Sequence, residues 1–394
     1  MNLNIHAQSG GARPQAGEGV RLDSLTALRF AAAMLVVLYH TGRYILPEAV
    51  PFTGLGYFGV SFFFVLSGFV LAWSMKAGTG VRAFYWKRFA RIYPLHLVMT
   101  AVAAIYLALS FGAIPWTKLP PVLLLMQSWI PSGEWKYAFN GVSWSLACEA
   151  FFYLIFPFIA PRLTTTTARK GRALAVAIFG AAMMFAALMM VTLPEEYWGA
   201  LTYTNPAFRV VEFILGILLA SAFKRGWRPR FGLRFGLAAV ACCYLLAYFV
   251  DRIFWNSLLD MPFVIANLLT LPGTLLLIAG AVSSDLGGQK SNPVLVRLGE
   301  WSFALYLVHE IFLRAGAQLS LKGPSSFVLA FVILVLSIGA SAALYAWVER
   351  PLEKMLRTLI GASPRPEEER AVDADSPALH RCTRRRQNAV WMRK

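Results

Sequence analysis

The chain has 394 residues, of which 58% are hydrophobic and only 14% are charged. A soluble protein of this length carries about 25% charged residues, so the composition excludes an ordinary soluble domain and indicates a polytopic membrane protein. The formal net charge of +17 does not indicate nucleic-acid binding, because the basic residues form short clusters between apolar runs, as the cytoplasmic loops of membrane proteins do.

Residues 1–24 are polar and glycine-rich, and we predict a disordered cytoplasmic tail there rather than a cleaved signal. Ten apolar runs follow, each close to the ~20 residues needed to cross a bilayer. We therefore expect an all-α fold with about ten transmembrane helices in one domain over residues 25–354. Residues 355–394 are basic, lack apolar periodicity and should form a second disordered cytoplasmic tail. The ten runs cover residues 25–46, 55–76, 92–114, 142–161, 171–193, 207–223, 232–250, 262–282, 299–319 and 326–346.

The basic residues predict the orientation of these helices. With the N-terminus inside, 29 of the 37 Lys and Arg residues lie in cytoplasmic segments, six lie in outer loops and two lie within spans. Such an imbalance follows the positive-inside rule, so we expect both termini in the cytoplasm.

Arg29 and His40 are separated by ten apolar or aromatic residues in the first run. Eleven helical steps make about three turns, so both side chains project from nearly the same face, roughly 16 Å apart along the axis. Arg29 has an ordinary explanation, because a long cationic side chain can snorkel to cytoplasmic headgroups. His40 can cap a buried hydrogen bond, but a histidine at membrane depth is also a candidate functional residue and the side chain best suited to accept a proton near neutral pH.

Three further groups of ionisable residues have both a structural and a functional interpretation. Arg88 and Arg91 are three residues apart before the third run, where they can anchor the loop inside or bind phosphates. Glu149 lies within the fourth run and must be either protonated or partnered. Glu349 lies at the inner boundary beside Arg350, where an interfacial ion pair is the simpler interpretation.

Other buried candidates favour structural roles. Arg209 and Glu212 are three apart on one helix and are expected to pair with each other. His309 and Glu310 lie in the middle of the ninth run, without an assigned role. The four cysteines form no metal-binding or disulfide pattern, and no nucleotide-binding or zinc-protease motif is present, so we expect no metal.

Six motifs in this order resemble the membrane-bound acyltransferase 3 family, the bacterial O-acyltransferases that modify surface glycans, exopolysaccharides and related acceptors. The resemblance runs from about residue 21 to 354. The motifs are RLDSLTALRFAAAMLVVLYH, GVSFFFVLSGFVL, RFARIYP, WSLACEAFFYLIFP, LGEWSFALYLVHEIF and VERPL.

The resemblance implies an O-acyltransferase in the bacterial inner membrane. It would move an acyl group, most simply acetyl, from cytoplasmic acyl-CoA to a hydroxyl of an extracytoplasmic or lipid-linked glycan. His40 would act as general base or carry the acyl group covalently, with Glu149 or Glu349 as an orienting carboxylate. The family motifs also fall on Arg29, Arg88 and Arg91, which would bind the CoA phosphates.

Three positions depart from the family pattern, and two other functions compete. Position 61 is serine where the family often has aspartate, Ala150 replaces a larger or polar residue, and Glu310-Ile311 follows His309 where the family usually continues x-Pro. Buried Arg, His and Glu residues also suit a proton-coupled transporter or glycan exporter. A non-catalytic scaffold in a polysaccharide machine is the third class, and acyl-CoA binding would separate it from the enzyme.

Overall fold

The computed structural model describes residues 21–254, except 77 and 79, and residues 262–359; within these ranges every regular element is a helix and there is no strand. Most of residues 1–24 and most of the segment from 355 onward, where we expect disordered tails, lie outside this part. Ten helices correspond to the ten apolar runs: α1 (Asp23–Tyr44), α3 (Phe58–Ser74), α4 (Val81–Phe111), α7 (Trp144–Thr165), α8 (Ala168–Thr192), α10 (Pro206–Lys224), α11 (Leu233–Phe254), α12 (Phe263–Leu286), α14 (Ser302–Ala317) and α15 (Pro324–Leu344).

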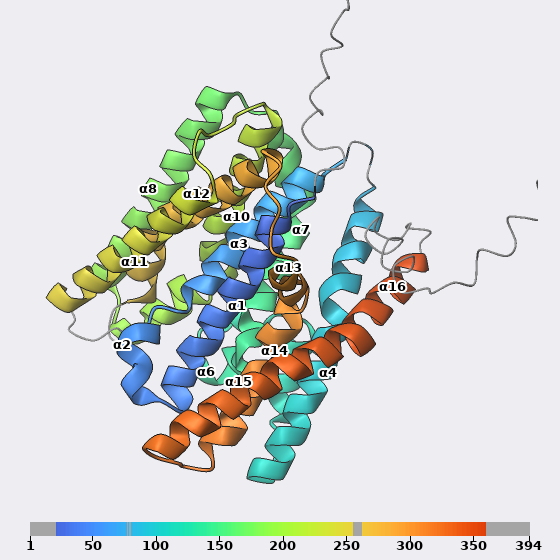
Figure 1. Cartoon of the computed structure of the whole chain (residues 1–394), viewed down its shortest axis with the longest axis vertical. Helices are drawn as coiled ribbons and strands as arrows, with labels where there is room; N and C mark the ends of the chain where they lie inside the picture. Colours follow the sequence, from blue (N-terminus) through green and yellow to red (C-terminus); the bar gives the residue numbers. More distant parts are fainter. Residues whose placement is uncertain (1–20, 77, 79, 255–261, 360–394) are drawn as a thin grey trace, which may run out of the picture.

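Short helical segments lie between these ten helices and, as η6 and α16, after the last of them (Figure 1). Six are α-helical: α2 (Val50–Thr53), α5 (Leu119–Leu123), α6 (Gly133–Lys136), α9 (Glu195–Trp198), α13 (Pro293–Glu300) and α16 (Arg350–Thr358). Four are 3-10 turns, η1 (Pro47–Ala49), η2 (Trp116–Lys118), η3 (Gln127–Trp129) and η4 (Gly141–Ser143), and two are π-helical, η5 (Gly199–Tyr203) and η6 (Tyr345–Glu349).

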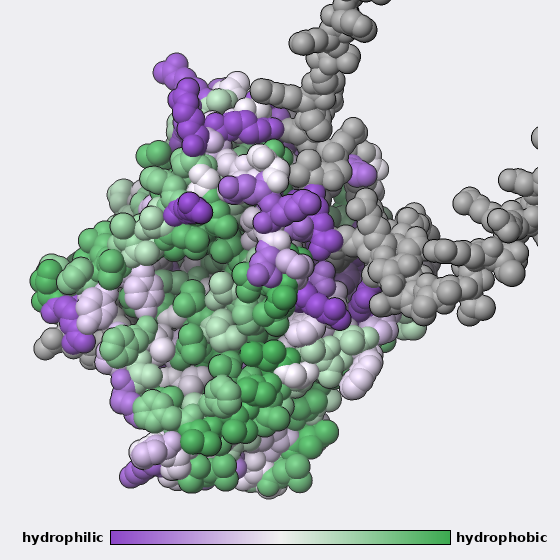
Figure 2. Space-filling view, in the orientation of Figure 1, coloured by the Kyte–Doolittle hydropathy of each residue, from purple (hydrophilic) through white to green (hydrophobic). Residues whose placement is uncertain are grey.

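The structure confirms a polytopic all-helical membrane protein but not the expected count of ten spans. In the described part of the chain, eight helices are long and apolar enough to cross a membrane, and a ninth is obtained when the bent pair of Pro47–Thr53 and Phe58–Ser74 counts as one span. Helix α14 has only 16 residues, and most of them are buried among the other helices. Hydrophobic side chains cover most of the visible surface, and hydrophilic ones gather mainly toward the upper part of the view in Figure 2.

Helix α1 lies against α3, α12, α13 and α14, so it is central to the bundle. Close approach depends on glycines of its neighbours: a Cβ atom at Gly59 of α3 or at Gly299 of α13 would overlap a backbone carbonyl oxygen of α1. Asp285 of α12 fixes the start of α1, because its carboxylate accepts hydrogen bonds from the backbone N–H and the hydroxyl of Ser24. This carboxylate satisfies a backbone donor that the first turn of a helix leaves free.

Helix α4 begins at Val81 rather than near residue 92, which corrects the expected start of the third run. Pro94 lies inside this helix and does not mark its beginning. Tertiary contacts stabilise the additional turns: the Tyr85 hydroxyl donates to the Leu154 carbonyl of α7, and the Trp86 indole donates to the Leu356 carbonyl of α16. Arg88 and Arg91 therefore project from a helix and not from a loop.

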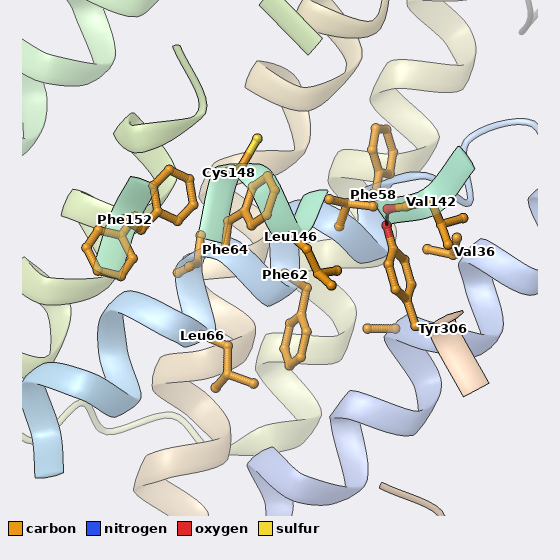
Figure 3. Packing of buried hydrophobic residues seen from close by; sticks show 14 of the residues in the cluster. Val36, Phe58, Phe62, Phe64, Leu66, Val142, Leu146, Cys148, Phe152 and Tyr306 are labelled. Carbon is orange, nitrogen blue, oxygen red and sulfur yellow. Dashed lines mark hydrogen bonds between the residues drawn. The ribbon is translucent and has the colours of Figure 1, made fainter. Parts of the chain in front are cut away.

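Aromatic side chains fill the contact between α3, α7 and α10 (Figure 3). Phe64 and Phe152 meet edge to face with ring centroids 5.1 Å apart, and Phe152 stacks on Phe213 at 4.9 Å. Helices α3 and α10 can approach this closely because each presents a glycine to the other. A Cβ atom at Gly68 would overlap the carbonyl oxygen of Phe213, and one at Gly216 would overlap that of Val65.

We expect Gly68→Ala to destabilise the protein by about 1–3 kcal/mol, because the added methyl group forces α3 away from α10. The measurement is the thermal unfolding midpoint of the purified protein in detergent. Gly180→Ala is the matched control, since a Cβ at Gly180 of α8 meets no atom within 4 Å. Equal midpoints for the two variants would show that the α3–α10 contact tolerates a wider spacing.

Candidate active site

His40 of α1 forms a hydrogen bond with His309 of α14. The Nδ1 atom of His40 lies 2.9 Å from the Nε2 atom of His309, and the two ring centroids are 5.1 Å apart. His309 is fully buried, whereas His40 is partly exposed. The two residues are 269 positions apart in the sequence, so this histidine pair exists only because α1 packs against α14.

The surroundings of His309 determine how protons are distributed over the pair. Its Nδ1 atom lies 3.1 Å from the carbonyl oxygen of Leu305, and a carbonyl only accepts, so this nitrogen carries the hydrogen. In a neutral His309 ring, Nε2 is then the acceptor and Nδ1 of His40 is the donor. The Nε2 atom of neutral His40 keeps its lone pair, and it has no hydrogen-bond partner among the described residues. The pair thus orients a free imidazole base.

Glu310, next to His309, joins three elements beside the pair. Its carboxylate accepts from the Tyr44 hydroxyl at 3.0 Å, from the backbone N–H of Val142 at 2.7 Å and from Arg314 at 2.7 Å. Tyr306, one turn before His309, donates to the Val142 carbonyl at 3.1 Å, as Figure 3 shows. These bonds hold the start of α7 and the end of α1 against α14, which fixes the position of both histidines.

The arginine–glutamate cluster (Arg29, Arg88, Arg91, Glu149, Glu349) contains the other five residues selected from the sequence. Arg91 donates to Glu349 and, at 3.2 Å, to Glu353 of α16. The Glu349 side chain is only 1% exposed. It projects from the π-helical turn η6. Pro351 follows in the first turn of α16, where its missing N–H removes no helical hydrogen bond.

Arg29 and Glu149 belong to the same charged neighbourhood. Arg29 is close enough to Glu149 and Glu349 for its charge to act on both carboxyl groups. Its side chain therefore has acidic neighbours within the protein, in addition to the lipid headgroups that a snorkelling arginine would reach. Glu149 accepts a hydrogen bond from the Tyr153 hydroxyl at 3.2 Å. The guanidinium of Arg88 lies 5.9 Å from the ring centroids of both Phe84 and Tyr153. A cleft of about 190 Å³ opens between α4 and α7, with Arg88, Tyr93, Ala150 and Tyr153 in its wall.

The structure therefore separates the predicted residues into two groups. His40 lies apart from the arginine–glutamate cluster, about three helical turns from Arg29 along α1. Neither Glu149 nor Glu349 is its hydrogen-bond partner; that position belongs to His309. Sequence reasoning gave His309 no role, although a histidine at membrane depth was itself a signal.

Arg209 and Glu212 form a separate buried network. Arg209 Nε lies 2.9 Å from Glu212 Oε2, which confirms the expected pairing within α10. Arg209 also donates to the Ser61 hydroxyl at 3.1 Å, and Ser61 in turn donates to Asn267 at 3.2 Å. Ser61 is thus a neutral member of this network. In the described part of the chain, no group of three His, Cys, Asp or Glu residues is arranged to hold a metal ion.

The structure thus describes a multi-pass helical protein with a buried histidine pair and, apart from it, an arginine–glutamate cluster contributed by α1, α4, α7 and η6. The chain belongs to the acyltransferase 3 family, because the family model for an acyltransferase domain matches residues 22–346. The predicted membership in this family and the predicted acyltransferase activity are both confirmed, which favours an enzyme over a transporter or a scaffold.

The relatives extend over most of the chain. Acyltransferase MdmB of Streptomyces mycarofaciens is 34% identical in an alignment 385 residues long, and the match covers 88% of this chain and 96% of the relative. Exopolysaccharide production protein ExoZ of Rhizobium meliloti is 31% identical over 314 residues, or 76% and 90% of the two chains. A Staphylococcus aureus protein with O-acetyltransferase in its name is 25% identical over 359 residues, 84% of this chain and 57% of the relative. No solved structure is significantly similar to the chain.

We expect Glu349→Gln to lower the free energy of unfolding by about 1.5–3 kcal/mol, because it removes one of the two carboxylates that accept hydrogen bonds from Arg91. Unfolding of the purified protein in detergent measures the loss. Glu134→Gln is the control: it removes a carboxylate 80% exposed in its pair with Lys118, and such pairs contribute about 0–1 kcal/mol. A Glu349→Gln variant as stable as the control would contradict the structural role of this ion pair.

Proposed function

We propose that the protein is a membrane O-acyltransferase that moves an acyl group, most simply acetyl, from acyl-CoA to a hydroxyl group of a glycan. The observation that carries this proposal is the histidine pair, because it leaves one imidazole nitrogen, Nε2 of His40, free to accept a proton. The name of the Staphylococcus aureus relative supports an oxygen acceptor, and the name of the Rhizobium relative supports an exopolysaccharide or a lipid-linked precursor of one.

The proposed reaction uses Nε2 of His40 twice. This nitrogen takes the proton from the acceptor hydroxyl while the oxygen attacks the thioester carbonyl. The new C–O bond forms and the C–S bond breaks, and the protonated imidazole returns its proton to the departing CoA thiolate. His309 keeps Nδ1 of His40 protonated and stabilises the imidazolium by accepting its N–H. A covalent acyl-histidine would form on the same nitrogen, so both routes need the same orientation.

Arginines of the arginine–glutamate cluster hold the CoA phosphates in this proposal. A guanidinium group can bind two phosphate oxygens at once, so arginines suit the phosphates of CoA. We assign this role to Arg29, Arg88 and Arg91 together, and Arg88 and Arg91 lie one turn apart on α4. Glu149 and Glu349 maintain the charge balance around these arginines.

We further propose that the bundle lies in the bacterial inner membrane with ten spans and both termini in the cytoplasm. This requires α3 and the short helix α14 to count as spans, which the burial of α14 inside the bundle supports. The arginine–glutamate cluster is then cytoplasmic, where CoA is present, and the histidine pair lies toward the outer side. The separation along α1, roughly 16 Å, is the distance that the pantetheine arm of CoA would bridge.

We expect His40→Ala to reduce the rate of acyl transfer about 10²- to 10⁴-fold, the usual contribution of a general base. The assay is acceptor-dependent release of CoA from acetyl-CoA by the purified protein. His96→Gln is the control, because this histidine is buried in α4 and its Nε2 contacts the Val122 carbonyl, a bond that glutamine can also donate. Near-normal transfer by the His40→Ala protein would refute the central assignment.

His309 provides an internal check on the same experiment. Residues that act as one unit have non-additive effects, so His40→Ala combined with His309→Ala should be no slower than His40→Ala alone. His309→Ala alone should lower kcat by about tenfold or more and leave the acyl-CoA affinity unchanged. A double variant whose losses multiply would show that the two histidines act independently.

We expect Arg88→Ala to weaken acyl-CoA binding by roughly tenfold, because a charge-assisted phosphate contact contributes about 1.5–3 kcal/mol. Titration with acetyl-CoA at several salt concentrations measures both the affinity and its salt dependence, which should become shallower. Arg82→Ala, an exposed arginine near the start of the same helix, is the control. If the affinity and its salt dependence are unchanged, Arg88 does not bind CoA and serves only as a basic residue that anchors this side of the bundle in the cytoplasm.

A further inference from the structure

The segment between α4 and α7 folds back onto the bundle beside the histidine pair. Arg314 of α14 donates to the Phe139 carbonyl at 3.3 Å, and the Asn140 amide donates to the Leu307 carbonyl at 2.8 Å. Glu310 accepts from the backbone of Val142, as described above. Residues 136–142 are therefore held against the part of α14 that carries His309, the partner of His40.

Lys136 in this segment is an unusual lysine. It is only 8% exposed, and burial lowers the pKa of its ammonium group. Among the described residues it forms no ion pair. Its ammonium group makes a cation–π contact with the neighbouring ring of Tyr137, with 5.1 Å between Nζ and the ring centroid. Two other basic residues of the proposed outer side are neutralised, Lys118 by Glu134 and Arg314 by Glu310. A buried cation without a carboxylate partner costs free energy that a ligand can recover.

Tyr137 connects this lysine with the end of α1. Its ring is 37% exposed, and its hydroxyl has no hydrogen-bond partner among the described residues. Burial raises the pKa of the Tyr137 hydroxyl, while nearby Tyr39, Glu310 and Tyr44 raise it further and Arg43 opposes them. Tyr39, Arg43 and Tyr44 are the residues that flank His40 on α1. The ring of Tyr44 is 6.1 Å from that of His40.

We propose that Lys136, Tyr137 and Arg43 form an acceptor subsite that recognises an acidic sugar. The half-exposed ring of Tyr137 presents a flat apolar surface with a polar tip, which suits the face of a sugar ring. The ammonium of Lys136 and the exposed guanidinium of Arg43 attract a carboxylate or phosphate on that sugar or its neighbour. This inference rests on the proposed function, because it assumes that a glycan approaches His40 from this side.

The test measures glycan binding rather than turnover, so that it does not depend on catalysis. The full-length protein in detergent is titrated with trigalacturonate, with glucose 6-phosphate and with neutral maltotriose, each in the wild-type and in the His40→Ala background. We expect trigalacturonate or glucose 6-phosphate to bind more tightly than maltotriose in both backgrounds, and the difference to shrink as salt increases. Whichever of the two acidic ligands binds more tightly shows whether the subsite prefers a carboxylate or a phosphate.

Variants then assign the binding to this subsite. Lys136→Gln should weaken the binding of the acidic ligand about fivefold, because the bound sugar itself stays in contact with solvent, and it should leave the binding of maltotriose unchanged. Lys136→Arg should retain the preference, which excludes a folding defect as the cause. Lys322→Gln is the control, because it removes an exposed lysine of the proposed outer side. The proposal is overturned if neither acidic ligand binds better than maltotriose, or if Lys136→Gln and Lys322→Gln have equal effects. If the wild-type protein binds the acidic ligand through this subsite but transfers no acyl group, the proposed function alone is refuted.

Discussion

The structure depends on one constraint, which is the cost of placing ionisable groups inside an apolar bundle. A buried charge or imidazole must be paired or hydrogen-bonded, since water is not available there to solvate it. His40 meets this requirement through His309, Arg209 through Glu212, and Arg91 through Glu349. Each pair also joins helices or fixes a side chain within one, so the polar groups that are costly to bury determine how the helices are arranged.

The arginine–glutamate cluster and the histidine pair differ in how this constraint is met. In the arginine–glutamate cluster, full charges balance one another over α1, α4, α7 and the α15–α16 segment. In the histidine pair, two neutral rings share one hydrogen bond, and the pair ends on a backbone carbonyl. A neutral pair can take up and release a proton without rearranging a set of counter-charges. The cluster suits the binding of a highly charged donor, whereas the pair suits chemistry on an uncharged hydroxyl.

Much of this organisation could be predicted from the sequence, and the missing parts have a common physical reason. Apolar runs of sufficient length determine helices locally, so all ten runs are helical, and the i, i+3 spacing of Arg209 and Glu212 was enough to predict their pairing. The partner of His40 is 269 residues away and that of Arg91 is 258 residues away, so neither pairing leaves a local pattern. The early start of α4 also depends on distant contacts, through Tyr85 and Trp86. The number of membrane spans stays a prediction, because α14 is short and enclosed by its neighbours, so its length and composition do not identify it as a span.

Because α1 is anchored at both ends, the number of residues between Arg29 and His40 determines how these two side chains are oriented relative to each other. Asp285 fixes the first turn, and the Tyr44 hydroxyl on Glu310 fixes the last. One residue inserted between these anchors would rotate the following side chains by about 100° and shift them by about 1.5 Å. His40 would then face away from α14 while Arg29 kept its position. The length of α1 therefore determines how the proposed donor-binding residues and the proposed base are placed relative to one another, and it is less tolerant of an inserted residue than of a change in side-chain size.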